Sequence, residues 1–119
     1  MVSAQLHFGD IVLAADGTYA SKPRPVLVFQ NSNFPTGESI IVIPFTSENN
    51  AAAHYCVAVS PSPANGLDRQ CWLEVEKVSA IRAAWTGPRV GTLDIKVLEQ
   101  ASALAHQLMS AEAEQTHTI

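Results

Sequence analysis

The 119-residue chain has few of the residues that build metal centres, disulfide frameworks or membrane spans. It holds only two cysteines, Cys56 and Cys71, and they form no CxxC or Cys/His ligand spacing. Its four histidines are scattered without an HExxH-like pair, and no apolar stretch approaches the roughly 20 residues that a membrane helix needs. The sequence therefore predicts no metal site, no cofactor and no membrane segment. Both cysteines are expected to be free thiols in a reducing compartment.

Charge is also sparse, and its balance is acidic. Only 15% of the residues are charged, and seven Lys and Arg against eleven Asp and Glu give a net charge of −4. Such a balance is not typical of a protein that binds nucleic acid through its overall field. The bases are clustered, however: Lys22 and Arg24 are near neighbours, and four of the seven fall between Arg69 and Arg89. We therefore expect a local cationic groove and modest affinity for polyanions.

The length is that of one compact domain, residues 1–119, and is too short for two domains of ordinary size. With 47% hydrophobic residues, the composition is ordinary for a soluble protein. The first eight residues lack the basic and long apolar regions of a signal peptide, so a cytoplasmic location is expected.

The stretch 22–30, KPRPVLVFQ, holds the first candidate for chemistry. Arg24 lies between two prolines, which keep its backbone extended at the start of the apolar run 26–29. The run shows no alternation, which is typical of a strand buried on both faces. An isolated arginine at a strand start is more often simply solvated, but a rigidly held, planar guanidinium suits phosphate recognition.

The second candidate lies where the apolar run 39–45 ends, at Thr46 and Ser47. Two adjacent hydroxyls at a strand end are usually turn or capping groups, so this feature is weak by itself.

Apolar periodicity predicts short strands at 10–15, 26–29, 39–45, 54–60, 70–82 and 90–93. In the fifth strand Trp72, Glu74 and Glu76 are expected to face outward. The parity of the apolar positions shifts near Lys77, which predicts a bulge or break there. Residues 85–88 are expected to form a turn. An amphipathic helix is predicted over about 94–111, capped by Thr92 or Asp94, with a frayed tail at 112–119. These elements predict a mainly β fold with a C-terminal α-helix, arranged as a small, strongly bent barrel.

Five short motifs carry a family resemblance: GDIV at 9–12, RPVLV at 24–28, PFTS at 44–47, NGL at 65–67 and GTL at 91–93. In order and spacing they cover nearly the whole chain and resemble the MazF/PemK toxins. The resemblance implies an SH3-like barrel and a homodimer. It also implies a type II toxin–antitoxin system, whose toxin is a sequence-selective endoribonuclease of single-stranded RNA, neutralised by a cognate antitoxin protein.

By the same resemblance, Arg24 matches the family's catalytic arginine and Thr46 its catalytic threonine. The implied chemistry needs no metal: the ribose 2′-hydroxyl attacks the adjacent phosphorus and leaves a 2′,3′-cyclic phosphate and a 5′-hydroxyl. Arg24 would stabilise the developing negative charge, and Thr46 would donate a hydrogen bond to the phosphate. No residue is assigned as the proton acceptor, because arginine stays protonated near neutral pH.

Four residues are expected to bind substrate: Tyr19, Lys22, Ser47 and Lys77. Tyr19 and Lys22 lie in the loop that precedes Arg24, and Ser47 follows Thr46. This loop lacks the Gly-Ser-Glu-like sequence of many family members, so the resemblance assigns neither the RNA target sequence nor the role of the loop. Trp72 and Trp85 are further aromatic candidates for contact with bases.

Two other classes of function stay open on the sequence alone. A barrel of this kind occurs in CcdB-like toxins, which bind DNA gyrase without an active site. A catalytically silent module that binds only an antitoxin peptide is the other alternative. The presence of both Arg24 and Thr46 favours the ribonuclease.

Overall fold

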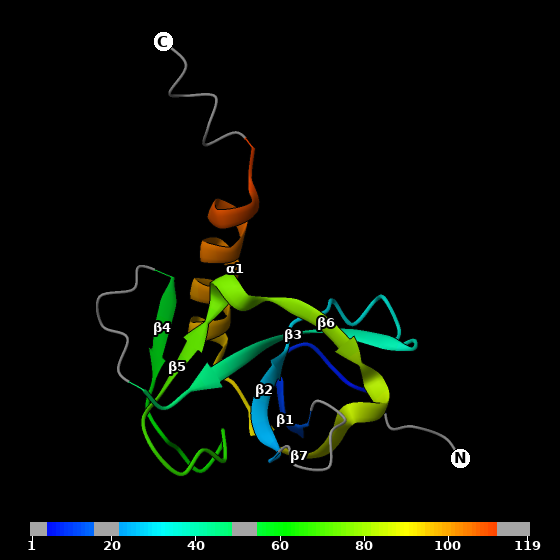
Figure 1. Ribbon diagram of the computed structural model, residues 1–119. Coiled ribbons are helices and arrows are strands. Elements are labelled where there is room, and N and C mark those ends of the chain that lie inside the picture. The colour runs from blue at the N-terminus through cyan, green and yellow to red at the C-terminus, as the bar shows by residue number, and fades with distance from the viewer. Residues whose placement is uncertain (1–4, 16–21, 49–54, 112–119) are drawn as a thin grey trace.

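Seven antiparallel strands and one helix make up the part of the chain that the computed structural model describes, residues 5–15, 22–48 and 55–111 (Figure 1). The strands are β1 (Asp10–Ala14), β2 (Arg24–Val28), β3 (Ser39–Thr46), β4 (Cys56–Val59), β5 (Cys71–Glu74), β6 (Ser79–Arg82) and β7 (Thr86–Thr92). The helix α1 spans Ile95–Met109, and 3₁₀ turns lie at Val75–Lys77 and Ala83–Trp85. The predicted mainly β fold with a C-terminal helix is confirmed. Among the described residues, no helix has the length and hydropathy that a membrane crossing requires.

The long strand β3 bends the sheet, because it has different neighbours along its length. One edge pairs with β2; the other pairs with β6 over Ser39–Val42 and then with β5 at Phe45 and Thr46. The strand order is β4-β5-β3-β2-β1-β7, with β6 beside β3. Within the described residues no ladder joins β4 to β7, so the predicted barrel is strongly bent but open.

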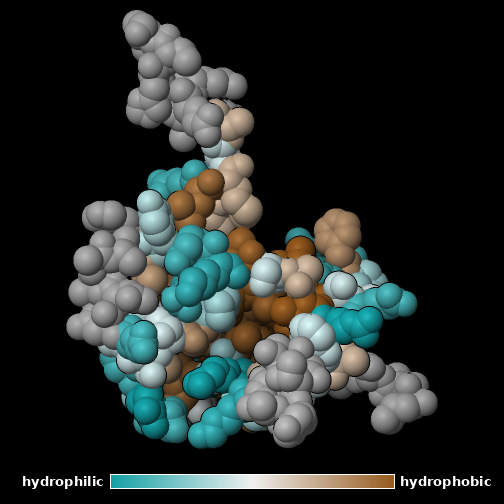
Figure 2. Space-filling view, in the orientation of Figure 1, coloured by the Kyte–Doolittle hydropathy of each residue, from teal (hydrophilic) through white to brown (hydrophobic). Residues whose placement is uncertain are grey.

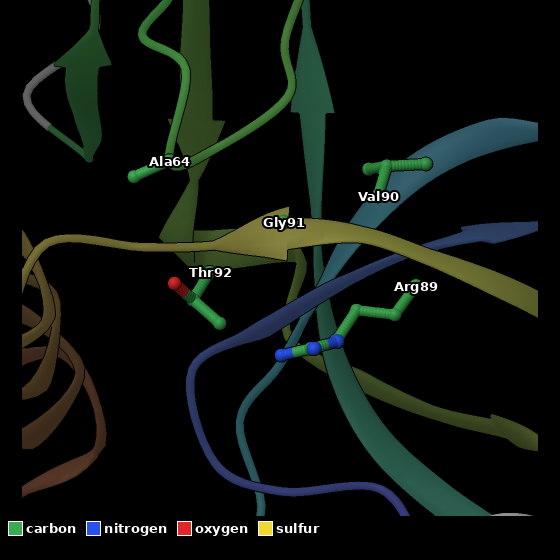
Figure 3. Close-up of a pocket in the computed structure, with 5 residues that line it drawn as sticks. All are labelled: Ala64, Arg89, Val90, Gly91 and Thr92. Atoms are coloured by element: carbon green, nitrogen blue, oxygen red, sulfur yellow. The ribbon is translucent and has the colours of Figure 1, made fainter.

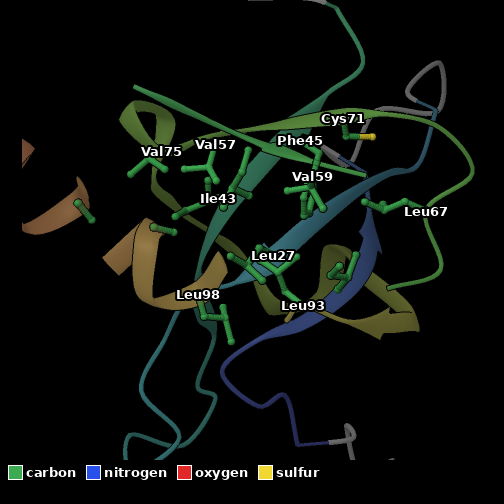
Figure 4. Close-up of a cluster of buried hydrophobic side chains, with 14 residues drawn as sticks. Leu27, Ile43, Phe45, Val57, Val59, Leu67, Cys71, Val75, Leu93 and Leu98 are labelled. Atoms are coloured by element: carbon green, nitrogen blue, oxygen red, sulfur yellow. The ribbon is translucent and has the colours of Figure 1, made fainter. Parts of the chain in front are cut away.

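The main core lies between α1 and the inner face of the sheet (Figure 4). Leu27, Ile43 and Leu73 are fully buried there, and Ala101 of α1 packs into the same cluster. The helix thus covers a side of the core that a closing ladder would otherwise cover.

A second, smaller apolar cluster lies on the opposite face of β1, β2 and β3. Its buried members are Val12, Val26, Val28, Ile40 and Val42. Because alternate side chains enter different clusters, both faces of β2 are covered, which explains the unbroken apolar run after Arg24. Figure 2 shows apolar residues gathered around β3 and β6, where Ile41 is 41% exposed.

Two local predictions are confirmed and one is wrong. The break near Lys77 is the 3₁₀ turn Val75–Lys77, which separates β5 from β6. The helix begins after Asp94, whose carboxylate accepts the Lys96 N–H at 3.0 Å, and ends at Met109; the tail 112–119 lies outside the described residues. Residues 86–88 belong to β7 rather than to the expected turn. Pro88 is tolerated because β7 is the last strand of the order, where a missing N–H breaks no second ladder.

Candidate active site

The start of β2 and the end of β3 lie at the same end of one hairpin. The two strands pair from Val28↔Val42 to Val26↔Pro44. Arg24 is the first residue of β2 and Thr46 the last of β3, each two positions beyond that final pair. Since side chains alternate along a strand, Arg24 shares a face with Val26, and Thr46 shares that face with Pro44. The structure therefore brings the two predicted catalytic residues to one face of one sheet end.

The Arg24 side chain is exposed, and its guanidinium makes no ion pair or hydrogen bond with another described residue. Its backbone is held by its place in the ladder, opposite Ala14 of β1. The donors of Arg24 are thus directed to solvent from a fixed base, as an anion-binding group requires.

The other predicted basic cluster is largely neutralised within the protein. Three of the four bases between residues 69 and 89 are paired with acids: Arg69 with Asp68 at 3.4 Å, Lys77 with Glu74 at 3.2 Å and Arg89 with Asp10 at 3.6 Å. The fourth base, Arg82, makes no ion pair with a described residue. The expected cationic groove is therefore narrower than the sequence suggests and centres on Lys22 and Arg24, which are exposed and pair with no described acid.

The Thr46 hydroxyl accepts one hydrogen bond from the backbone. The backbone N–H of Glu48 donates to Thr46 Oγ1 at 3.2 Å, a local turn contact. This contact restrains the half-buried side chain and leaves the O–H hydrogen free to donate. The turn role and the proposed donor role are therefore compatible. Ser47 is exposed beside it.

The other two predicted substrate-binding residues are Tyr19 and Lys77. Tyr19 lies outside the described residues. Lys77 lies in the turn after β5, where its ammonium contacts the carboxylate of Glu74. Glu74 is only 8% exposed, so the expectation that it faces solvent is wrong; the 3₁₀ turn folds Lys77 back over the carboxylate.

The model of the PemK-like, MazF-like toxins of type II toxin–antitoxin systems matches residues 7–109 of the chain. The chain belongs to this family. A probable endoribonuclease MazF of Mycolicibacterium smegmatis is 38% identical to it over 86 residues, which cover 71% of this chain and 79% of that protein.

Solved structures of the family share the fold. Mycobacterium tuberculosis toxin MazF-mt6 is 24% identical with a TM-score of 0.64, over 81% of this chain and 90% of that one. A mycobacterial endoribonuclease in complex with its cognate antitoxin is 14% identical with a TM-score of 0.67, over 86% of this chain and 90% of that one. At these identities the likeness concerns architecture alone.

A hollow of about 260 Å³ lies beside β7, and neither Arg24 nor Thr46 lines it (Figure 3). Backbone and small side chains form most of it, and the one charged group, Arg89, is already paired with the buried carboxylate of Asp10. The lining residues are Ala64, Arg89, Val90, Gly91 and Thr92. These lining residues include no carboxylate, thiol or imidazole, so none of them is an acid or base suited to catalysis near neutral pH.

The position of one aromatic candidate, Trp72, relative to the site was not predicted from the sequence. Trp72 of β5 lies directly opposite Thr46 of β3 in the ladder. Alternation along β5 indicated that Trp72 faces outward, but alternation does not reveal which strand lies beside it. The register places this indole next to the candidate catalytic threonine.

Proposed function

We propose that the protein is a toxin that cleaves single-stranded RNA at selected sequences without a metal ion. The observation that carries the proposal is the exposed guanidinium of Arg24, which makes no ion pair with a described residue, at the same sheet end as the restrained Thr46 hydroxyl. Membership of a toxin family and a relative named as a probable endoribonuclease support the same conclusion.

The proposed reaction is an internal transesterification. The ribose 2′-oxygen forms a bond to phosphorus while the bond from phosphorus to the 5′-oxygen breaks. The 2′-hydroxyl loses a proton and the leaving 5′-oxygen gains one, so the products carry a 2′,3′-cyclic phosphate and a 5′-hydroxyl. Negative charge grows on the non-bridging oxygens, where Arg24 and the Thr46 O–H would donate hydrogen bonds. Neither residue is assigned the proton transfers, because arginine stays protonated and Thr46 acts here as a hydrogen-bond donor.

Flanking groups are proposed to hold the RNA on either side of the scissile phosphate. Lys22 lies two residues before Arg24, and the Ser47 hydroxyl follows Thr46. Tyr19 is proposed to contact a base. Lys77 keeps two N–H donors besides the one directed at Glu74 and is proposed to contact a more distant phosphate.

We further propose that the protein acts in the cytoplasm as a homodimer neutralised by a cognate antitoxin. A mycobacterial structural relative was solved with its own antitoxin, which supports a protein partner of this kind. Because the chain offers little positive charge, antitoxin binding is expected to depend mainly on apolar contacts. An affinity for the antitoxin that collapses in moderate salt would contradict this expectation.

The test is to incubate the purified protein with a long single-stranded RNA in excess EDTA and to map both product ends. Discrete cuts that leave 2′,3′-cyclic phosphate and 5′-hydroxyl ends are expected. If the folded protein makes no cuts at any concentration, a gyrase-binding toxin or a silent antitoxin-binding module replaces the ribonuclease. Cuts that disappear in EDTA would refute the metal-free reaction.

A further inference from the structure

The strands around the candidate site place their side chains in one row. Thr46 of β3 pairs with Trp72 of β5, and Trp72 pairs with Ala58 of β4 on its other side. The β2–β3 register, continued past its last pair, puts Arg24 at the far side of Thr46. The row therefore runs Arg24, Thr46, Trp72, Ala58 across four strands.

The indole of Trp72 belongs to the same face as the Thr46 hydroxyl. Its neighbours along β5, Cys71 and Leu73, are buried in the main core. Alternation turns Trp72 to the other face, which is the face of Thr46 because the two residues are directly opposite. Trp72 is half-buried, so its packing fixes the ring while part of it stays accessible.

Nothing large covers the indole from the neighbouring outer strand. Its cross-strand partner there is Ala58, which is exposed and has only a methyl group. Directly opposite side chains in antiparallel strands have Cβ atoms about 4.5–5.5 Å apart. A phosphate held by Thr46 would therefore bring the base of an adjoining nucleotide within reach of the Trp72 ring.

We propose that the exposed part of the Trp72 indole is a nucleobase-stacking subsite beside the scissile phosphate, an inference that rests on the proposed ribonuclease function. Base stacking on an aromatic side chain contributes affinity without needing positive charge. A chain with a net charge of −4 has little general attraction for RNA, so stacking would add binding energy to the few proposed polar contacts near the reacting atoms. Because every base has a π-face, the subsite fixes the position of the strand more than the identity of the base.

The test uses a short single-stranded RNA that contains one mapped cut, and it compares KM and kcat among variants. Trp72→Ala is expected to raise KM by roughly 10- to 100-fold, from the usual value of one base–aromatic stack, with kcat changed only a few-fold. Trp72→Phe keeps a π-face and should stay close to wild type. Trp72→Leu fills space without a π-face and should resemble Trp72→Ala, which separates stacking from packing.

The matched control is Phe34→Ala. Phe34 is an aromatic residue that is 67% exposed in the loop at the other end of the β2–β3 hairpin, so its removal should leave KM unchanged. Thermal unfolding of each variant shows whether the fold survives, and Trp72→Leu replaces Trp72→Ala if the latter unfolds.

Two different results would overturn the inference, and they distinguish failure of the stacking subsite from failure of the ribonuclease proposal. If the wild type cuts RNA and Trp72→Leu has a wild-type KM, the stacking subsite is wrong while the ribonuclease stands. If the folded wild type cuts no RNA, the ribonuclease proposal fails and the subsite fails with it.

Discussion

Thr46 connects local structure with the proposed chemistry at the scale of a single residue. Its oxygen accepts the Glu48 N–H, and its proton is left for a ligand. A threonine that only capped a turn could be replaced without effect on the reaction. A threonine that donates a hydrogen bond to the phosphate could not be replaced without slowing the reaction.

Thr46→Val removes the hydroxyl and keeps the β-branched shape. The rate constant kcat for RNA cleavage is expected to fall by roughly 10²- to 10³-fold, the usual effect of one lost donor to a developing oxyanion. Thr46→Ser should keep most of the activity. Ser39→Ala, which removes an exposed hydroxyl at the other end of β3, is the control. A wild-type kcat for Thr46→Val would exclude the donor role.

The two thiols allow a prediction about pH. Burial raises the pKa of Cys71, and burial together with the negative charges of Glu76 and Glu74 raises the pKa of Cys56. Folding therefore favours the neutral thiol, so this contribution to stability is complete below the unfolded-state pKa of about 8.5 and is lost as the pH rises further.

Urea unfolding at a series of pH values checks the thiol prediction. The free energy of unfolding should fall as the pH rises above about 8.5, and a Cys56→Ala/Cys71→Ala double variant should fall less steeply. Iodoacetamide should react more slowly with both thiols in the folded protein than in urea. Equal rates in the two states would contradict the predicted shifts.

At this scale, local motifs located some candidate residues, while the surroundings of others depended on tertiary structure. Arg24 and Thr46 lie in local motifs, so they could be located before the fold was known. The position of Trp72 beside Thr46 depends on β5 pairing with the second half of β3, which is a tertiary fact. The burial of Glu74 depends on a turn that folds Lys77 back over it, and strand alternation cannot show this.

At the scale of elements, the segment 60–67 crosses β7 in close contact, and the Thr92 N–H donates to the Ala64 carbonyl at 2.9 Å. Asn65 is buried and holds this segment: Oδ1 accepts the N–H groups of Ser62 and Leu67, both at 3.0 Å, and Nδ2 donates to the Ser60 carbonyl at 2.9 Å. Gly91 of β7 faces it so closely that a Cβ there would collide with the Asn65 backbone. The sequence motifs NGL and GTL thus meet at one crossing.

Gly91→Ala is expected to lower the free energy of unfolding by about 1–3 kcal/mol, the usual cost of overpacking, because the Asn65 backbone must shift. Gly37→Ala is the matched control: a Cβ at Gly37 would meet no atom within 4 Å, so its effect should be small. Denaturant titration measures both. A Gly91→Ala variant as stable as wild type would show that the segment moves freely away from β7.

Element positions were predictable where periodicity was strong. The stripe of α1 and the apolar runs of β2 and β3 located these elements to within about two residues. The start of β7 was missed because Gly87 and Pro88 are turn formers by composition, and only its place as the last strand makes them acceptable. The open form of the barrel likewise depends on which strands pair, which no local pattern reveals.

At the scale of the whole molecule, the small number of charged residues limits the electrostatic attraction between the protein and RNA. The chain is acidic overall, and three of its bases are paired with acids within the protein. The proposed phosphate contacts are Lys22, Arg24 and Lys77. Three contacts to a single strand give a slope of log K against log salt of about −2.

Binding of an RNA with one 2′-deoxy sugar at the cut position, measured from low to moderate salt, checks this number. A slope of about −2 is expected, and Arg24→Ala should make it shallower by about 0.7. A slope steeper than about −4 would mean that the RNA meets more positive charge than the three proposed contacts provide.

The central claim is that Arg24 stabilises charge on the scissile phosphate, and the most direct test compares two arginines. Arg24→Ala is measured against Arg82→Ala, which removes another exposed arginine at the other end of β3, where Arg82 pairs with Ser39. In EDTA, with an RNA of one mapped cut, Arg24→Ala is expected to lower kcat by roughly 10²- to 10³-fold while Arg82→Ala stays near wild type. Equal activity of the two folded variants would contradict a catalytic role for Arg24.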